Sequence, residues 1–174
     1  YLMLGNYYAY SNLNQALLCY KQALFYCDDT ADADTINDYI NDAMANGARL
    51  RQVSIVITGC KEYEEKNSLI ESITSTVPED EYEIILSGEN INDGIKLGNP
   101  FSDVFILNKN MLLAENSLFY LMLGAYSDEC VGAVGGLTNQ VNGIETGQAV
   151  DVDISHMEYA VESVKKINSP LINA

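Results

Sequence analysis

Three runs rich in β-branched residues, separated by helical segments, constrain the fold of this chain more than any other feature. The runs are VSIVIT at 53–58, EYEIIL at 81–86 and DVFILN at 103–108. The first run is typical of a strand that is buried on both faces, and the other two predict a second and a third strand. Leu69, Ile70 and Ile73 have helical spacing in the first gap, and INDGIKLG fills the second. The alternation predicts an α/β fold with a mostly parallel sheet and flanking helices.

Downstream of the third run, the pattern predicts a helix from Asn116 to about Tyr126 and a further strand at 130–136, CVGAVGG. Ser155 and Glu158 have the spacing of a capping box and predict a last amphipathic helix. We therefore expect residues 51–174 to form one α/β domain.

The first fifty residues are predicted to be helical. Apolar spacing over residues 4–24 is interrupted at SNLN, which indicates two short helices. The second helix has one apolar face made of Ala16, Leu17, Tyr20, Ala23 and Leu24. A third helix follows, with Asp34 as its expected N-cap and Gly47 as its end. Two arrangements remain open: the end of a repeat array, or a helical hairpin that packs on the next domain.

The charge balance excludes some classes of partner. The chain of 174 residues has 25 acidic residues and 9 Lys and Arg, which gives a formal net charge of -16. This charge repels nucleic acid and anionic membrane surfaces. No apolar run reaches the roughly 18 residues that a membrane span needs. We expect a soluble protein of the cytoplasm, where its four cysteines, which form no C-x-x-C pair, stay reduced.

Ligands of parallel α/β sheets bind beyond the carboxyl ends of the strands. The positions to inspect are therefore residues 58–61, 86–90 and 108–110, which follow the three predicted strands. The third of these segments reads Asn108-Lys109-Asn110.

The N-terminal segment resembles a tetratricopeptide repeat, in which Leu4-Gly5, Tyr8, Ala16, Tyr20 and Ala23 fall in the order of the motif. Such repeats are stable through stacking on their neighbours. The resemblance implies that residues 1–50 are the end of a longer array, and the start at Tyr1 rather than Met agrees with a longer protein. It also implies a protein partner that binds the helical repeats.

Residues 51–139 resemble the family 2 glycosyltransferases of GT-A fold, in particular bacterial members with helical repeats ahead of the transferase domain. The resemblance rests on VSIVI, SLIESI, PEDEYEIIL, NDGIKLGNPFSDVFILNKN and AENSLFYLMLGAYSDECVGAVGG. In its most specific stretch, ILNKN stands where the family has Leu-Asn-Asn-Asp or Asp-x-Asp. The resemblance implies an enzyme that transfers a sugar from a nucleotide-diphosphate donor to an acceptor.

The resemblance also implies roles for particular residues. Asn92, Asn108 and Asn110 would face the donor, and the base pocket would be shaped by Thr58, Gly59, Cys60 and Lys61. A divalent cation, Mg²⁺ or Mn²⁺, would neutralise the diphosphate, with Asn110 as a ligand. A carboxylate would serve as the general base.

Several positions depart from the family pattern. Asn108 and Asn110 replace carboxylates, and Cys60-Lys61 replaces a Tyr-Asn pair. A β-α segment is expected to be missing after Leu86, and the acceptor-binding half is expected beyond Ala174. Lys61 or Lys109 could supply the positive charge instead of a metal, although a solvated loop lysine is the alternative for both.

A second hypothesis follows from these departures. The domain would then be a catalytically degenerate transferase that acts as a protein-interaction module through its helical repeats. A receiver-like signalling domain is a weaker third reading, because no aspartate ends the first or third strand. The pair Asp151 and Asp153 spells an Asp-x-Asp but alternates with apolar residues, as in an edge strand.

Overall fold

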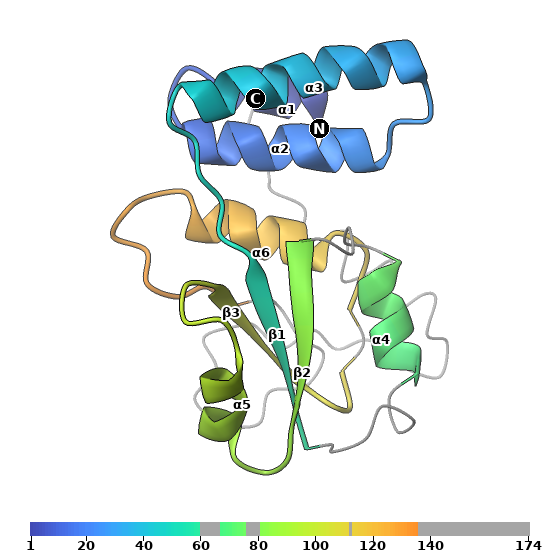
Figure 1. Ribbon diagram of the computed structural model, residues 1–174, viewed down its shortest axis with the longest axis vertical. Coiled ribbons are helices and arrows are strands. Elements are labelled where there is room, and N and C mark those ends of the chain that lie inside the picture. The colour runs from blue at the N-terminus through green and yellow to red at the C-terminus, as the bar shows by residue number, and fades with distance from the viewer. Residues whose placement is uncertain (60–66, 76–80, 112, 136–174) are drawn as a thin grey trace, which may run out of the picture. The chain divides into compact units, whose positions relative to one another are not determined.

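The computed structural model describes residues 1–59, 67–75, 81–111 and 113–135 (Figure 1). These residues contain six helices and a three-stranded parallel sheet, which confirms a mixed α/β fold. They divide into two compact units. One joins Tyr1–Ala48 with the described residues from Ala114 onward, and the other is Arg49–Leu113. The division into domains at 1–50 and 51–174 stays a prediction.

The unit Arg49–Leu113 holds the sheet. Its elements are β1 (Val53–Thr58), α4 (Asn67–Thr74), β2 (Tyr82–Ser87), α5 (Ile91–Leu97) and β3 (Asp103–Asn108). The three predicted strands are confirmed to within one residue at each end, because each β-branched run is bounded by polar or glycine-containing segments. The strand order is β2-β1-β3, with β1 parallel to both neighbours (Figure 1).

Helix α5 packs over β1 and β2 through a glycine. A Cβ atom on Gly94 would lie 2.6 Å from Val56 Cγ1 and 2.7 Å from Ser87 Cβ. The helix therefore sits close enough to the sheet that only a residue without a side chain fits there. In α4, Leu69 and Ile73 are fully buried, as the helical spacing predicts.

A carboxylate fixes the loop between α5 and β3. Glu83 Oε1 accepts hydrogen bonds from the Ser54 hydroxyl at 2.6 Å and from the Asn99 backbone N–H at 2.9 Å. These hydrogen bonds favour the ionised form and lower the pKa of Glu83. The loop is thus attached to the face of the sheet on which α5 packs.

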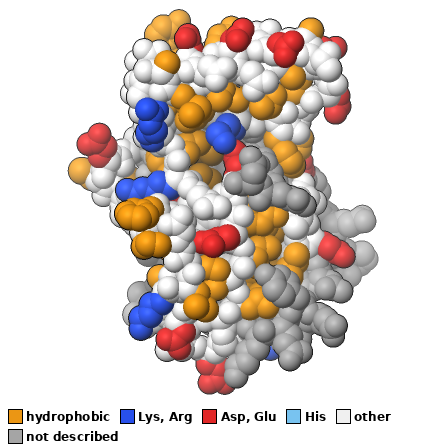
Figure 2. All heavy atoms as spheres, viewed as in Figure 1, with side chains coloured by type: hydrophobic (Ala, Val, Ile, Leu, Met, Phe, Trp, Pro, Cys, Tyr) orange, Lys and Arg blue, Asp and Glu red, His pale blue; other side chains and the backbone are white. Residues whose placement is uncertain are grey.

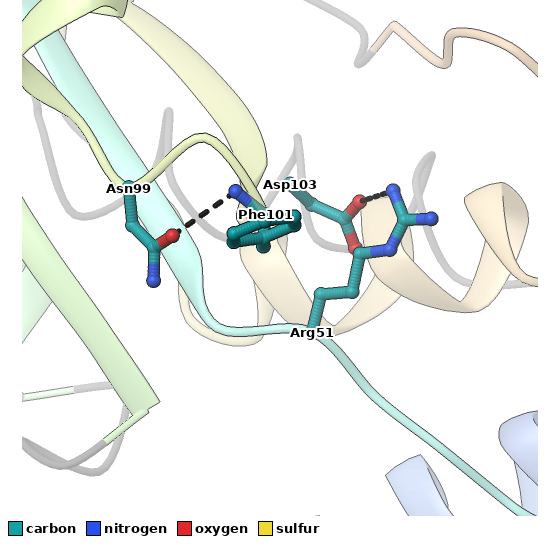
Figure 3. Close-up of polar contacts among 4 residues, drawn as sticks. All are labelled: Arg51, Asn99, Phe101 and Asp103. Atoms are coloured by element: carbon teal, nitrogen blue, oxygen red, sulfur yellow. Dashed lines mark hydrogen bonds and ion pairs between the residues drawn. The ribbon is translucent and has the colours of Figure 1, made fainter.

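The amino-terminal edge of the sheet is polar (Figure 3). Arg51 Nη1 lies 3.6 Å from Asp103 Oδ1, and the Phe101 backbone N–H donates to Asn99 Oδ1 at 3.0 Å. Arg51 is exposed and Asp103 is half-buried, and an ion pair that water reaches in this way contributes little to stability. Its position at the start of β1 and β3 marks the edge opposite to the strand ends where ligands are expected.

The other unit is helical, with α1 (Leu2–Tyr8), α2 (Leu13–Phe25), α3 (Thr30–Ala45) and α6 (Ser117–Ala125). The prediction that Asp34 is the N-cap of the third helix is wrong. The helix begins at Thr30, five residues earlier than that cap predicts, and Asp29 Oδ1 accepts from the backbone N–H groups of Ala31 and Asp32. Several aspartates here are suitable caps, and Asp29, the second of the adjacent pair that follows α2, takes the role.

Gly47 ends α3 as predicted. Its φ of +103° is in the left-handed region, and its N–H donates to Met44 O while that of Ala48 donates to Ala43 O. These two bonds form a Schellman motif, which satisfies carbonyls in the last turn.

Helices α1, α2 and α3 pack around Tyr20. A Cβ atom on Gly5 would lie 2.6 Å from Tyr20 Cδ1, so α1 approaches the ring closely. The Tyr20 hydroxyl donates to Asn6 Oδ1 at 2.9 Å, and its ring stacks on Tyr39 with centroids 5.4 Å apart. Ala16 is fully buried beside this cluster. One aromatic side chain on α2 therefore connects all three helices.

Polar side chains on α2 and at its N-cap hold α6. The hydrogen bonds are Asn12 Nδ2 to Tyr126 O at 2.7 Å, Gln15 Nε2 to Leu123 O at 2.8 Å and Gln22 Nε2 to Asn116 Oδ1 at 2.8 Å. The predicted helix near 116–126 is confirmed. The strand predicted at 130–136 is wrong over residues 130–135, where the structure has no strand. Two glycines and an alanine in this stretch are weak strand formers.

Candidate functional site

The candidate site lies at the carboxyl ends of the three strands. The register pairs Thr58 with Ser87 on one side and with Asn108 on the other. Residues paired in a parallel sheet point to the same face, so these three side chains form one row. Ser87 is buried, Thr58 is half-buried and Asn108 is exposed. The row therefore opens to solvent on the β3 side.

Hydrogen bonds position the hydroxyl groups of this row. Thr58 Oγ1 donates to Leu107 O at 3.1 Å, and Ser87 Oγ donates to Asn90 O at 2.7 Å. Each hydroxyl oxygen keeps its lone pairs, which can accept hydrogen bonds but cannot attract an anion. The row by itself is suited to polar contacts and not to charge neutralisation.

Two residues extend the sheet one position beyond the row. The N–H of Gly59 donates to Gly88 O at 2.9 Å, and the N–H of Lys109 donates to Thr58 O at 3.0 Å. Gly59 has a φ of +82°, a conformation that glycine adopts without strain. The stem of Lys109 lies over it, with Cδ 3.3 Å and Cγ 3.4 Å from where a Cβ of residue 59 would be. The contact between these residues joins the ends of β1 and β3.

The segment after β3 is a tight turn. The Asn110 N–H donates to Asn108 Oδ1 at 3.0 Å, and the Met111 N–H donates to Asn108 O at 2.9 Å. The Asn108 side chain thus fixes its own loop, as asparagine does in Asx turns. Asn110 is exposed. Of the two predicted donor-facing asparagines here, one shapes the turn and the other projects from it.

The asparagine side chains of this turn are poor ligands for a divalent cation on their own. Mg²⁺ is usually held through carboxylates, whereas Asn108 and Asn110 offer neutral amide oxygens, one of which accepts a backbone hydrogen bond. Over the described part of the chain, no group of three or more His, Cys, Asp or Glu side chains could hold a metal ion. The role of Asn110 as a metal ligand stays a prediction.

Asn92 lies on the β2 side of the same edge. Its backbone N–H donates to Asn90 Oδ1 at 3.1 Å, and Asn90 Nδ2 donates to Asp93 Oδ2 at 2.9 Å. Asn90 is therefore the N-cap of α5, and Asn92 is exposed in the first turn. The structure brings Thr58, Gly59 and Asn108 to neighbouring strand ends, while Asn92 lies in α5, which follows β2 on the far side of β1.

Cys60 and Lys61 lie outside the described residues, as do Asp151, Asp153 and the helix expected from Ser155. Ser87 was not among the predicted site residues. Its place in the row follows from the register, and the only sequence signal for it is its position at the end of a β-branched run.

The helical unit has a concave surface of its own. It has a volume of about 420 Å³ and is lined in part by Asn6, Tyr10, Tyr39, Asp42 and Asn46. Tyr10 is almost fully exposed at 95%. Four exposed aspartates lie on α3, which contains no Lys or Arg: Asp32, Asp34, Asp38 and Asp42. Figure 2 shows acidic side chains spaced along this helix, which is uppermost in that view. The groove itself is lined by tyrosines and by one of these aspartates, Asp42.

No protein-family model matches the sequence, and comparisons with curated proteins and with solved structures found no match either. Among the described residues, no helix is both long and apolar enough to cross a membrane.

Proposed function

We propose that the unit Arg49–Leu113 binds the nucleotide diphosphate of a sugar donor and belongs to a glycosyltransferase of family 2 type with a GT-A fold. The observation that carries the proposal is the strand order β2-β1-β3. The chain leaves β1 toward β2 and then returns across β1 to β3, so the connections diverge at the boundary between β1 and β3. Open α/β sheets bind ligands in the crevice at such a point, beyond the carboxyl ends of the strands.

The residues at this boundary support the proposal. Gly59 makes room for the stem of Lys109, and Thr58, Asn108 and Asn110 supply polar groups at the same edge. In sugar transfer from such a donor the leaving group is a diphosphate, and the site must offset its negative charge. The described strand ends of β1 and β3, at Thr58, Gly59 and Asn108, are where that charge would lie.

The test is isothermal titration of UDP, GDP, ADP and dTDP into the chain, each with chelator and with added Mg²⁺ or Mn²⁺. We expect one nucleotide to bind with micromolar affinity. The variant Asn110→Ala should weaken binding, whereas Asn99→Ala, which changes an exposed asparagine at the opposite edge, should not. Absence of binding by every nucleotide under every condition would contradict the proposal.

A second candidate function rests on the groove of the helical unit. The close packing of Gly5 against Tyr20 agrees with a tetratricopeptide-like hairpin. A degenerate transferase would then serve as an interaction module. The tyrosines and Asp42 of its groove, on a helix with three further exposed aspartates, favour a basic peptide as partner. Fluorescence anisotropy with labelled Lys- and Arg-containing peptides tests this candidate. Binding should saturate and be weakened by Asp42→Asn, with Asp128→Asn, outside the groove, as the control. Equal binding by the two variants and the unchanged protein would reject it.

A further inference from the structure

The site poses a problem of charge. A donor diphosphate is strongly anionic, and the protein has a formal net charge of -16. The strand-end side chains Thr58, Ser87 and Asn108 are all neutral, and the nearby exposed Glu89 and Asp93 are acidic. A protein that binds a diphosphate at this edge therefore needs a local positive charge to offset repulsion.

Lys109 is placed to supply it. Its backbone N–H is bonded to Thr58 O, which fixes its Cα at the end of β3 beside the end of β1. Its stem then crosses to Gly59, with Cγ, Cδ and Cε at 3.4, 3.3 and 3.8 Å from the position of a Cβ there. The ammonium group is one bond beyond Cε. The side chain thus extends toward the boundary between β1 and β3, where the strand order places the ligand.

Gly59 makes this placement possible. Any other residue would put a Cβ against the lysine stem and would be strained at a φ of +82°. The glycine leaves room for the lysine stem, so that the charge of Lys109 lies beside the boundary between β1 and β3.

We propose that Lys109 binds the diphosphate of the donor nucleotide directly and supplies the positive charge that carboxylate-held metal would otherwise bring. This inference rests on the proposed function and names the group that recognises the anion at that site. A lysine binds phosphate as a point charge without requiring a set of hard ligands. Its two neighbours in sequence, Asn108 and Asn110, are neutral, which is compatible with that role. Binding of the diphosphate should then persist in the presence of a metal chelator.

The experiment is isothermal titration of the nucleoside, the nucleoside monophosphate and the nucleoside diphosphate of the best-binding base, with EDTA and with Mg²⁺. It compares the unchanged protein with Lys109→Met, Lys109→Arg and Lys96→Met. Methionine keeps most of the stem and removes the charge, whereas arginine keeps the charge. Lys96 is an exposed lysine in the last turn of α5 and serves as the matched control. Circular dichroism checks that each variant is folded.

We expect the diphosphate to bind in EDTA and to bind at least about tenfold more weakly to Lys109→Met, as for loss of a charge-assisted hydrogen bond. Lys109→Arg should retain most of the affinity and Lys96→Met all of it. Nucleoside affinity should be the same in Lys109→Met and the unchanged protein, which a general distortion of the loop would not produce.

Two results would overturn the inference in distinguishable ways. If the diphosphate binds only with Mg²⁺ and Lys109→Met binds it normally, Lys109 is not the diphosphate ligand and the proposed function stands. If the unchanged protein binds no nucleotide under either condition, the proposed function fails and the inference fails with it.

Discussion

Gln15 provides a sharp test of how α2 holds α6 within the helical unit. Its side chain is only 6% exposed, and its Nε2 donates to Leu123 O at 2.8 Å. Leu123 lies in the last turn of α6, where the backbone carbonyls receive no hydrogen bond from an N–H group of the same helix. We therefore expect replacement of Gln15 to leave a buried carbonyl without its donor.

The magnitude follows from two contributions. Removing the donor from a buried acceptor costs about 1–3 kcal/mol. Truncation to alanine also removes a buried methylene, which adds about 0.8 kcal/mol. Gln15→Met, which keeps the stem, should lose about 2 kcal/mol of the free energy of unfolding, and Gln15→Ala slightly more.

Urea unfolding measures this loss. Far-ultraviolet circular dichroism reports the helices, and fluorescence of the 12 tyrosines gives a second probe in a chain without tryptophan. Coincident transitions would support a two-state analysis. The exposed Gln52 is the control, because Gln52→Ala should stay within about 0.5 kcal/mol of the unchanged protein. A Gln15→Met variant within that same margin would refute the argument that this hydrogen bond holds α6.

Three further predictions concern single residues. Gly47→Ala should cost about 1 kcal/mol in thermal or urea unfolding, because φ is +103° there and no neighbour lies near enough to clash; an unchanged midpoint would contradict this. The exposed Cys130 should react with a thiol reagent in the native protein. Burial raises the pKa of Cys19 to about 12, so that this thiol stays protonated and unreactive below that pH. Equal labelling rates of the two cysteines would count against the buried position of Cys19. Arg51→Ala should change the free energy of unfolding by less than about 1 kcal/mol, because its ion pair with Asp103 is solvent-exposed; a larger loss would show that the pair is not screened by water.

Local sequence signals were sufficient for the strands and for most helix ends. The three β-branched runs became β1, β2 and β3, and Gly47 ended α3, because these features depend on backbone preferences within a few residues. The N-cap at Asp29 was missed for the opposite reason. Asp29 and Asp34 are equally able to accept backbone N–H groups, and the path of the chain after α2 chose between them.

The candidate site shows the same division. Residue types identified Thr58, Gly59, Asn108 and Asn110 as strand-end positions, since they directly follow or close predicted strands. The register that aligns Thr58 with Asn108 and the contact between Gly59 and Lys109 depend on pairing between segments about fifty residues apart in sequence.

What the sequence determined by itself was therefore the set of elements and the polar, largely neutral character of the strand-end loops. The tertiary structure decided which strand lies in the middle and which loops meet. Strand order follows from how helices cover the two faces of a sheet, and no single segment contains that information. For this reason the lysine at the end of β3 could be read from the sequence as a solvated loop residue, whereas its position over Gly59 emerged only once the strands were paired.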